Sequence, residues 1–242
     1  MYAWRLKSNF LYFFVAYDLV TGMEILNINE EGVLEKVVHA LRKGGVVCVP
    51  TDTVYGLIAD AGNEEAVQKI FDIKGREEEK PLPVFMSGIV MAREYAEISP
   101  EQERFLEKVW PGAVTVVFKG YFKETIGMRM PNDELLLNIL QKTGTPLAQT
   151  SANPSGKPPA RSAEEVLNYF GSALYAPALC VDPVESRLGR DHGAGGGERG
   201  GEASSVIDLT GATPKILRAG AVSSEELSRL LAHSGLPAPL GL

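Results

Sequence analysis

Short apolar segments alternate with amphipathic segments along most of the chain, and this alternation predicts the fold class. Apolar residues recur at helical spacing between Glu30 and Lys43, and Gly44 and Gly45 follow as a stop signal. The next segment, 46–50, is a continuous apolar run that ends in proline, which is typical of a buried strand. The beginning of the chain therefore predicts a helix followed by an internal strand.

Further helices are predicted where a capping residue precedes an amphipathic segment. Asn63, Ser99 and Asn132 stand at such positions, and the proline after Ser99 suits a first helical turn. The later predicted helices span 63–73, 99–110, 132–142, 162–170 and 223–232. The predicted strands span 46–50, 82–86, 113–118, 146–150, 178–181 and 204–209. Because strands and helices alternate, we expect a single α/β domain with a mixed or mostly parallel sheet.

The two ends of the chain differ from this pattern. Residues 1–22 contain an apolar patch at 10–17, which is shorter than the roughly 20 apolar residues that a membrane span needs. We expect residues 1–22 to be an extension outside the fold, residues 23–232 to form the domain, and residues 233–242 to be a C-terminal tail. The glycine-rich segment Gly189–Gly201 is predicted to be a mobile surface loop.

Composition excludes several classes of protein. The chain has 242 residues, with 45% hydrophobic and 23% charged residues, as folded globular proteins have. Its 24 basic and 31 acidic residues give 24 − 31 = −7, which argues against a protein that mainly coats nucleic acid but allows a local basic cavity. Two cysteines, Cys48 and Cys180, are too few for a disulfide scaffold or a four-ligand zinc site, so no protein-bound metal is predicted.

Candidate chemistry begins at the end of the first buried strand. The segment Pro50–Leu57 holds two hydroxyls, a carboxylate and a phenol within five positions, where open α/β sheets collect ligands. A second interpretation is a tight turn in which Thr51 and Asp52 bond their own backbone. The sequence alone leaves both interpretations open.

Three basic residues follow the next predicted helix. Lys74 and Arg76 flank a glycine, and Lys80 lies four residues beyond Arg76. Cations at the end of a helix often serve only its dipole. The same residues suit a triphosphate, since arginine binds phosphate with a bidentate fork and lysine as a point charge.

Polar residues also follow the later strands. The segment Thr150–Gly156 offers two hydroxyls and an amide, although an Asn–Pro turn accounts for part of this pattern. The segments Ser204–Asp208 and Ile216–Gly220 add hydroxyls and Arg218. As a set, these residues predict an anion-binding cavity that has no metal cage of its own.

Seven motifs follow one another in a fixed order over about residues 24–222. They are Pro50–Leu57, Lys74–Arg76 with Lys80–Leu82, Trp110–Gly112 with Thr115, Met128–Pro131, Thr150–Gly156, Ser204–Asp208 and Ile216–Gly220. Together they resemble the YrdC/Sua5 family of L-threonylcarbamoyladenylate synthases. The resemblance implies a YrdC-like twisted, mixed sheet with flanking helices around a deep basic cavity.

The resemblance also implies a reaction in which L-threonine, bicarbonate and ATP give threonylcarbamoyl-AMP and pyrophosphate. This reaction is the first stage in making the threonylcarbamoyl group beside the tRNA anticodon. Mg²⁺ would arrive with ATP, the product would pass to a downstream threonylcarbamoyl transferase, and contact with tRNA would be transient. The expected location is the cytoplasm, away from membranes, and the sequence carries no signal for an oligomeric state.

By motif position, the resemblance assigns a role to each site residue. The residues implied for catalysis are Lys74 and Arg76. Those implied for ATP are Arg76, Lys80, Thr115, Ser151, Asn153, Arg161 and Arg218. Those implied for threonine are Thr53, Arg129 and Ser204, with Arg129 pairing with the carboxylate.

Two positions depart from the family pattern, and two other functions compete with it. Phe85 stands where the family often has a histidine, and Glu77 stands where it usually has a proline. One competing function is a related carbamoyl-adenylate former, like the YrdC-like domain of the hydrogenase-maturation carbamoyltransferase. The other is an RNA-binding or ribosome-assembly module that uses the same basic cavity, which steep salt dependence without adenylate chemistry would reveal.

Overall fold

A computed structural model describes residues 23–75, 81–183 and 202–239 and shows a mixed α/β fold built on one ten-stranded sheet. The order of strands across the sheet is β1-β8-β2-β3-β7-β4-β6-β5-β9-β10. The strands are β1 (Glu24–Asn27), β2 (Val47–Val49), β3 (Gly56–Asp60), β4 (Val84–Phe85), β5 (Val114–Lys119), β6 (Thr125–Arg129), β7 (Leu147–Ser151), β8 (Leu179–Asp182), β9 (Ser205–Asp208) and β10 (Lys215–Arg218). The helices are α2 (Val33–Arg42), α3 (Glu64–Lys74), α4 (Ile89–Ala92), α5 (Pro100–Val109), α6 (Glu134–Thr143), α7 (Ala163–Phe170) and α8 (Ser224–Ala232).

The sheet is mixed, as one of the two predicted arrangements required. Four neighbouring pairs of strands run parallel and five run antiparallel, so the alternative of a mostly parallel sheet is wrong. Three of the antiparallel pairs arise because β3, β6 and β10 follow short loops, and the other two are formed by β7 with β3 and β4. The strands β1, β3, β6 and β10 had not been predicted.

Most predicted helices begin and end where the capping signals placed them. Asn63, Ser99, Ser162 and Ser223 each accept a hydrogen bond from a backbone N–H in the first turn of the following helix. The prediction that Asn132 caps α6 is wrong, because Asp133 is the cap and accepts from Leu136 N at 3.1 Å.

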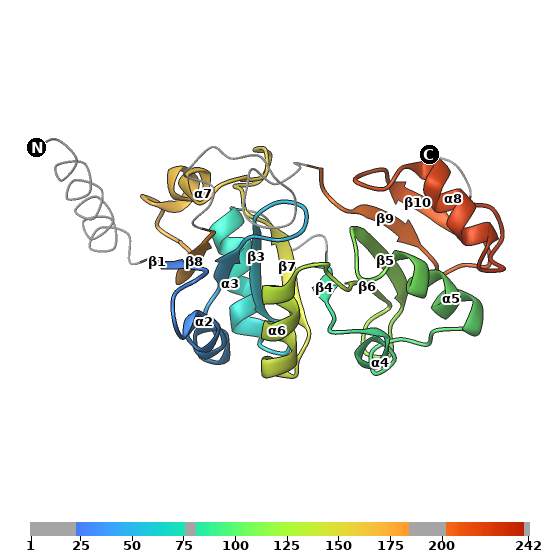
Figure 1. Cartoon of the computed structure of the whole chain (residues 1–242), viewed down its shortest axis with the longest axis horizontal. Coiled ribbons are helices and arrows are strands. Elements are labelled where there is room, and N and C mark those ends of the chain that lie inside the picture. The colour runs from blue at the N-terminus through green and yellow to red at the C-terminus, as the bar shows by residue number, and fades with distance from the viewer. Residues whose placement is uncertain (1–22, 76–80, 184–201, 240–242) are drawn as a thin grey trace, which may run out of the picture.

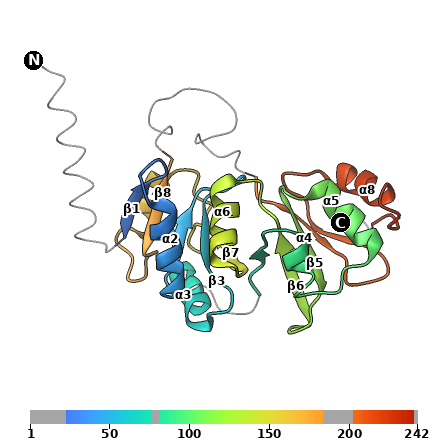
Figure 2. The same ribbon diagram turned by 60° about the horizontal axis from the view of Figure 1, so that its bottom comes forward.

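The half of the sheet nearer to β1 is covered on both faces, as Figures 1 and 2 show. Helices α2 and α6 pack together over one face of β2, β3, β7 and β8, and α3 and α7 cover the opposite face. Successive residues of a strand point to opposite faces, so Val47 and Cys48 belong to different cores. Cys48 and Cys180 are buried, free and paired in register between β2 and β8. Burial raises the pKa of the Cys48 thiol.

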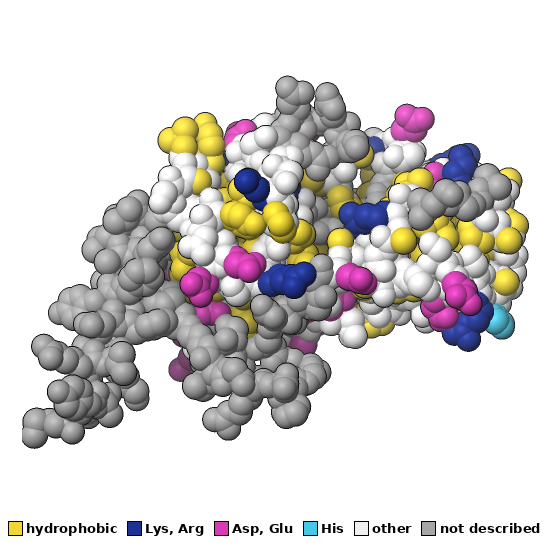
Figure 3. Space-filling view, turned by 90° about the horizontal axis from the view of Figure 1, so that it is seen from above, with side chains coloured by type: hydrophobic (Ala, Val, Ile, Leu, Met, Phe, Trp, Pro, Cys, Tyr) yellow, Lys and Arg dark blue, Asp and Glu magenta, His cyan; other side chains and the backbone are white. Residues whose placement is uncertain are grey.

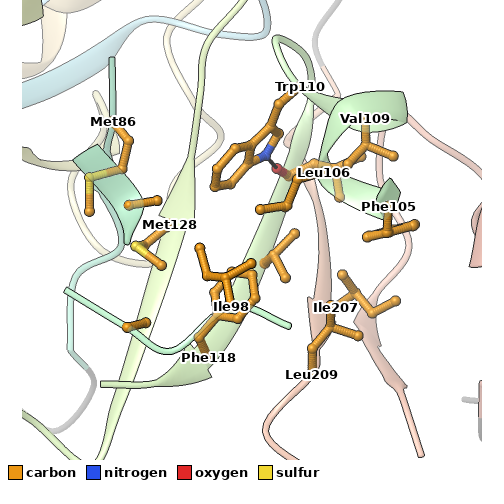
Figure 4. Packing of buried hydrophobic residues seen from close by; sticks show 14 of the residues in the cluster. Met86, Ile98, Phe105, Leu106, Val109, Trp110, Phe118, Met128, Ile207 and Leu209 are labelled. Carbon is orange, nitrogen blue, oxygen red and sulfur yellow. Dashed lines mark hydrogen bonds between the residues drawn. The ribbon is translucent and has the colours of Figure 1, made fainter. Parts of the chain in front are cut away.

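The other half of the sheet is packed differently. Helices α4, α5 and α8 all pack on the same face of β5, β6, β9 and β10, around the buried side chains that Figure 4 shows. Within this core the indole N–H of Trp110 donates to the carbonyl of Val114 at 2.8 Å. The opposite face of these strands carries Thr115, Arg129 and Val206. Thr115 and Arg129 are buried polar side chains on this face.

The two-residue strand β4 joins the two halves. Its Val84 contributes to the core around α5, and its Phe85 contributes to the core around α6. Figure 1 shows β4 between the two groups of elements. A very short strand thus fixes how the halves meet.

The ends of the domain remain predictions. Residues 1–22 and the predicted loop Gly189–Gly201 lie outside the described residues. Ser234, just beyond α8, is buried, and its hydroxyl donates to Leu230 O at 2.8 Å. No helix in the described part of the chain is both long and apolar enough to cross a membrane.

The N-cap of α5 provides a test of how capping residues stabilise the helices. Ser99 and Gln102 form a reciprocal capping box, in which each side chain accepts from the other's backbone N–H. We expect Ser99→Ala to lower the free energy of unfolding by about 1 kcal/mol in urea titrations. Ser224→Ala is the control, because Ser224 is the first residue of α8 rather than its cap, and a loss there equal to that at Ser99 would contradict the assignment.

Candidate active site

The loop after β2 forms a compact hydroxyl cluster. The Thr51 hydroxyl donates to the Val54 carbonyl at 2.6 Å and accepts from Thr53 N at 3.0 Å. The hydroxyls of Thr51 and Thr53 lie 3.0 Å apart, and both side chains are buried. The turn interpretation is therefore correct for Thr51, and that turn holds the Thr53 hydroxyl in place.

Asp52 does not bond its own loop but reaches Arg129, which is the last residue of β6. Its Oδ1 accepts from Arg129 Nη2 and its Oδ2 accepts from Asn132 N at 3.1 Å. Arg129 also donates through Nε to Gly112 O at 2.8 Å, and its Nη1 lies 3.4 Å from the Thr53 hydroxyl. The guanidinium carbon lies 5.7 Å from the centre of the Phe85 ring, within the range of a cation–π contact.

Lys74, at the end of α3, turns inward toward the segment after β7. Its side chain is buried, and Nζ donates to Ser151 O at 2.7 Å, to Asn153 O at 2.9 Å and to Asn153 Oδ1 at 3.3 Å. Gly75 ends the helix with a φ of 59°, which favours glycine. The Asn153 amide donates to Pro154 O and Lys157 O, as the Asn–Pro turn interpretation predicts. Lys74 therefore stabilises this turn through hydrogen bonds. An interaction with the dipole of α3 alone does not describe its role.

Another cluster of polar side chains joins β5, β9 and β10. The hydroxyls of Thr115 and Ser204 lie 2.9 Å apart and are buried. Arg218 donates through Nε to Ser204 O at 3.0 Å and through Nη2 to the same oxygen at 2.7 Å. Arg218 is paired in register with Val206, and Val206 with Thr115, so these side chains share a face of the sheet.

Electrostatic interaction links Arg129 with Arg218. Burial lowers the pKa of Arg129, while the carboxylates of Asp52 and Asp133 raise it. Partial burial lowers the pKa of Arg218, and the positive charge of Arg129 lowers it further. The two guanidinium groups thus repel each other across the same face, and an anion between them would relieve that repulsion. Figure 3 shows separate Lys and Arg side chains near the middle of the face that is seen from above Figure 1.

Both guanidinium groups keep donors for a ligand. Within the described part of the chain, the bonds of Arg129 use three of its five N–H groups, and those of Arg218 also use three, since its Nη2 donates to both the carbonyl and the hydroxyl of Ser204. The geometry can therefore hold two anionic groups beside the hydroxyls of Thr53, Thr115 and Ser204. This arrangement suits orientation and neutralisation of charge rather than attack by a protein nucleophile.

The remaining predicted residues are placed in part. Ser151 lies at the end of β7, and its hydroxyl donates to Asn153 Oδ1 at 2.6 Å. Arg161 is exposed and follows Ala160, whose carbonyl accepts from Tyr55 N at 3.0 Å, so its backbone lies beside the loop after β2. Arg76, Lys80 and Glu77 lie outside the described residues.

Asp52 is the residue whose role the sequence did not single out. A buried arginine needs a carboxylate partner, and that requirement could have directed attention to the one carboxylate in the motif Pro50–Leu57. The pairing itself joins positions 77 residues apart, which no local pattern indicates.

The Asp52–Arg129 pair leads to a prediction about stability. We expect Asp52→Ala to lower the free energy of unfolding by about 3 kcal/mol, because it leaves a buried guanidinium without its carboxylate. Glu35→Ala is the matched control, since Glu35 pairs with Lys142 at the surface, where an ion pair contributes little to stability. Urea unfolding followed by circular dichroism measures both, and equal losses would contradict the structural role of Asp52.

Comparison with known proteins identifies the family of this chain. The family model Sua5/YciO/YrdC, described as "Telomere recombination", matches residues 39–188. The threonylcarbamoyl-AMP synthase of Pyrococcus abyssi is 34% identical over 202 residues, which cover 79% of this chain and 55% of that protein. The putative threonylcarbamoyl-AMP synthase of Mycobacterium tuberculosis is 33% identical over 204 residues, which cover 80% of this chain and 87% of that protein.

Solved structures show the same fold. P. abyssi Sua5 complexed with L-threonine has a TM-score of 0.74 and 32% identity, covering 86% of this chain and 60% of that one. Escherichia coli YciO has a TM-score of 0.71 at 23% identity and covers 85% of this chain, which supports the fold alone. The chain thus spans just over half of the P. abyssi relative and most of the M. tuberculosis relative. From its sequence, its fold and these matches, the chain belongs to the Sua5/YciO/YrdC family.

Proposed function

We propose that this protein is a threonylcarbamoyl-AMP synthase, which converts L-threonine, bicarbonate and ATP to threonylcarbamoyl-AMP and pyrophosphate. The observation that carries the proposal is the pair of arginines, Arg129 and Arg218, which lie on the same face of the sheet as the Thr115 and Ser204 hydroxyls in a chain of this family. The reaction needs one site for a carboxylate and one for phosphates, and two separate guanidinium groups suit those two anions.

The threonine end of the site lies at Arg129. Its remaining N–H groups would pair with the amino-acid carboxylate, beside the hydroxyls of Thr53 and Ser204. Phe85 stands where the family often has a histidine, and its buried ring lies against the guanidinium of Arg129. Phe85 therefore braces the carboxylate-binding group through its ring, without a polar contact of its own.

The nucleotide end lies at Arg218 and Thr115, with Ser151, Asn153 and Arg161 lining the site. Within the described part of the chain, Arg218 has the two N–H groups of Nη1 left for phosphate oxygens. Arg76 and Lys80 would add further positive charge to the triphosphate. Together these residues would form the deep basic cavity of the fold.

The chemistry proceeds through a carbamate. Bicarbonate loses its hydroxyl group to give CO₂, and the threonine amine forms a bond to the carbon of CO₂. The proton that the amine loses combines with the released hydroxide as water, which leaves an N-carboxylate. A carbamate oxygen then attacks the α-phosphorus, the bond to the bridging oxygen of the β-phosphate breaks, and pyrophosphate leaves with the electron pair. The protein orients the two reactants and neutralises the developing charge, as in other phosphoryl-group chemistry.

Mg²⁺ belongs to the substrate in this scheme, because it would arrive bound to the ATP phosphates. The described residues contain no group of three His, Cys, Asp or Glu side chains that could hold a metal ion. The neighbouring guanidinium of Arg218 would share the phosphate charge with the ion.

Beyond the reaction, we propose a cytoplasmic enzyme that hands the adenylate to a threonylcarbamoyl transferase and meets tRNA only transiently. A mixed anhydride of a carbamate and a phosphate is reactive toward water, which favours direct delivery of the product. The net charge of −7 also disfavours a stable complex with RNA.

Release of pyrophosphate by the purified protein tests the proposed reaction. We expect release with ATP, Mg²⁺, L-threonine and bicarbonate, with loss of signal when threonine or bicarbonate is left out, and threonylcarbamoyl-AMP detected by mass. Release that needs neither threonine nor bicarbonate would contradict the proposal. RNA binding that weakens steeply with salt, without any adenylate formation, would support the RNA-binding alternative instead.

Lys74 leads to a second prediction about activity. We expect Lys74→Ala to reduce synthesis at least about 100-fold while the protein stays folded, because the turn that carries Ser151 and Asn153 loses a charged donor to three oxygens. The control is Lys69→Ala, since Lys69 lies on the same helix and donates to Gly44 O away from the site. Pyrophosphate release and circular dichroism decide the outcome, and wild-type turnover in Lys74→Ala would contradict it.

A further inference from the structure

Ser205 makes an unusual set of hydrogen bonds for a residue with no part in the proposed reaction. It is fully buried, on the face of β9 that points to the core around α5 and α8. Its hydroxyl donates to Val222 O at 2.6 Å and accepts from Gly220 N at 3.1 Å and from Val222 N at 3.0 Å. One side-chain oxygen thus binds three backbone groups of the turn that follows Arg218.

The strand that leads into this turn contains a bulge. Lys215 and Ile216 pair with Asp208 and Ile207, but Arg218 pairs with Val206, so Leu217 is an extra residue in β10. Side chains alternate between the faces of a regular strand, so without the bulge Arg218 would share the core face with Ile216. The bulge places Arg218 on the opposite face, beside Thr115 and Ser204.

The turn has little freedom apart from this contact. Ala221 N donates to Ala203 O at 3.0 Å, and a Cβ atom on Gly220 would lie 2.2 Å from that same carbonyl oxygen. The chain after Arg218 therefore runs directly against the residues before β9. The Ser205 side chain joins the start of β9 to the turn at residues 220–222, where these two parts of the chain cross.

We propose that Ser205 is a positioning residue, which locks the end of the bulged strand so that Arg218 faces the anion-binding side of the sheet. The inference rests on the proposed binding of ATP by Arg218. The physical reason is the cost of leaving buried backbone groups unpaired. Without the hydroxyl, two N–H groups lose their acceptor, and the turn relaxes away from β9. Arg218 then loses its fixed contact with the Ser204 carbonyl.

A merely structural serine would behave differently from a positioning one. If Ser205 only stabilised the fold, its removal would weaken ATP binding by the same factor whether Arg218 is present or absent. If Ser205 acts through Arg218, its removal has no effect on ATP binding once Arg218 is gone. A double-mutant cycle separates the two cases.

The experiment measures Mg²⁺-ATP affinity by calorimetry for the full chain and its variants Ser205→Ala, Arg218→Ala and the double variant. We expect Ser205→Ala to weaken binding about tenfold and Arg218→Ala about 10- to 100-fold, with the double variant equal to Arg218→Ala. Ser228→Ala is the matched control, because its hydroxyl donates to the backbone of α8 at Ser224 O and it should bind ATP as the wild type does.

A second readout reports on Arg218 without ATP. In ¹⁵N NMR spectra, the signal of the Arg218 Nε–H is assigned by its loss in Arg218→Ala. We expect slow solvent exchange of this proton in the wild type and in Ser228→Ala, and fast exchange in Ser205→Ala. If Ser205→Ala does not fold, Ser205→Cys keeps the shape and a weak donor and acceptor, and we expect a smaller change in the same direction.

The outcomes separate this inference from the proposed function. Unchanged exchange of the Nε–H in the Ser205 variants, or independent effects of the two substitutions on ATP affinity, would overturn the positioning role. A wild-type protein that binds no ATP would overturn the proposed function, and the NMR result would still decide the role of Ser205.

Discussion

The burial of one guanidinium, that of Arg129, is the constraint on which the arrangement of the site depends. A buried cation is stable only when its donors and its charge are matched, and the groups that match it come from three parts of the chain. Asp52 comes from the loop after β2, the Gly112 carbonyl from the segment before β5, and the Phe85 ring from β4. Pairing Arg129 therefore also fixes how the two halves of the sheet meet.

The distribution of helices then decides where the chemistry lies. One half of the sheet has helices on both faces, and this half supplies rigid loops such as those that carry Thr53 and Asn153. In the other half, α4, α5 and α8 all pack on one face, so hydroxyls and guanidinium groups gather on the opposite face. Every second residue of β5, β6 and β9 contributes to the core, and the residues between them are available for ligands.

The sequence predicted these features unequally. Capping residues placed the helices well, because a cap is a local hydrogen bond between near neighbours, and the single error was a shift from Asn132 to Asp133. The strands β1, β3, β6 and β10 were missed, since only pairing with other strands makes these short segments regular. The four-residue helix α4 was also missed, and it has no side-chain cap that could have indicated it. The motifs led to the right neighbourhood, but the partners of Lys74 and Arg129 lie about 80 residues away in sequence.

The extra residue in β10 has a consequence for comparing relatives of this chain. In a strand, position determines face, so inserting or deleting one residue exchanges the inward and outward sets for all that follows. A homologue without the bulge would display the cation that corresponds to Arg218 one position earlier, opposite Val206, where this chain has Leu217. Column-by-column alignment would then score such a protein as lacking the arginine, although the two cations would occupy the same place in space.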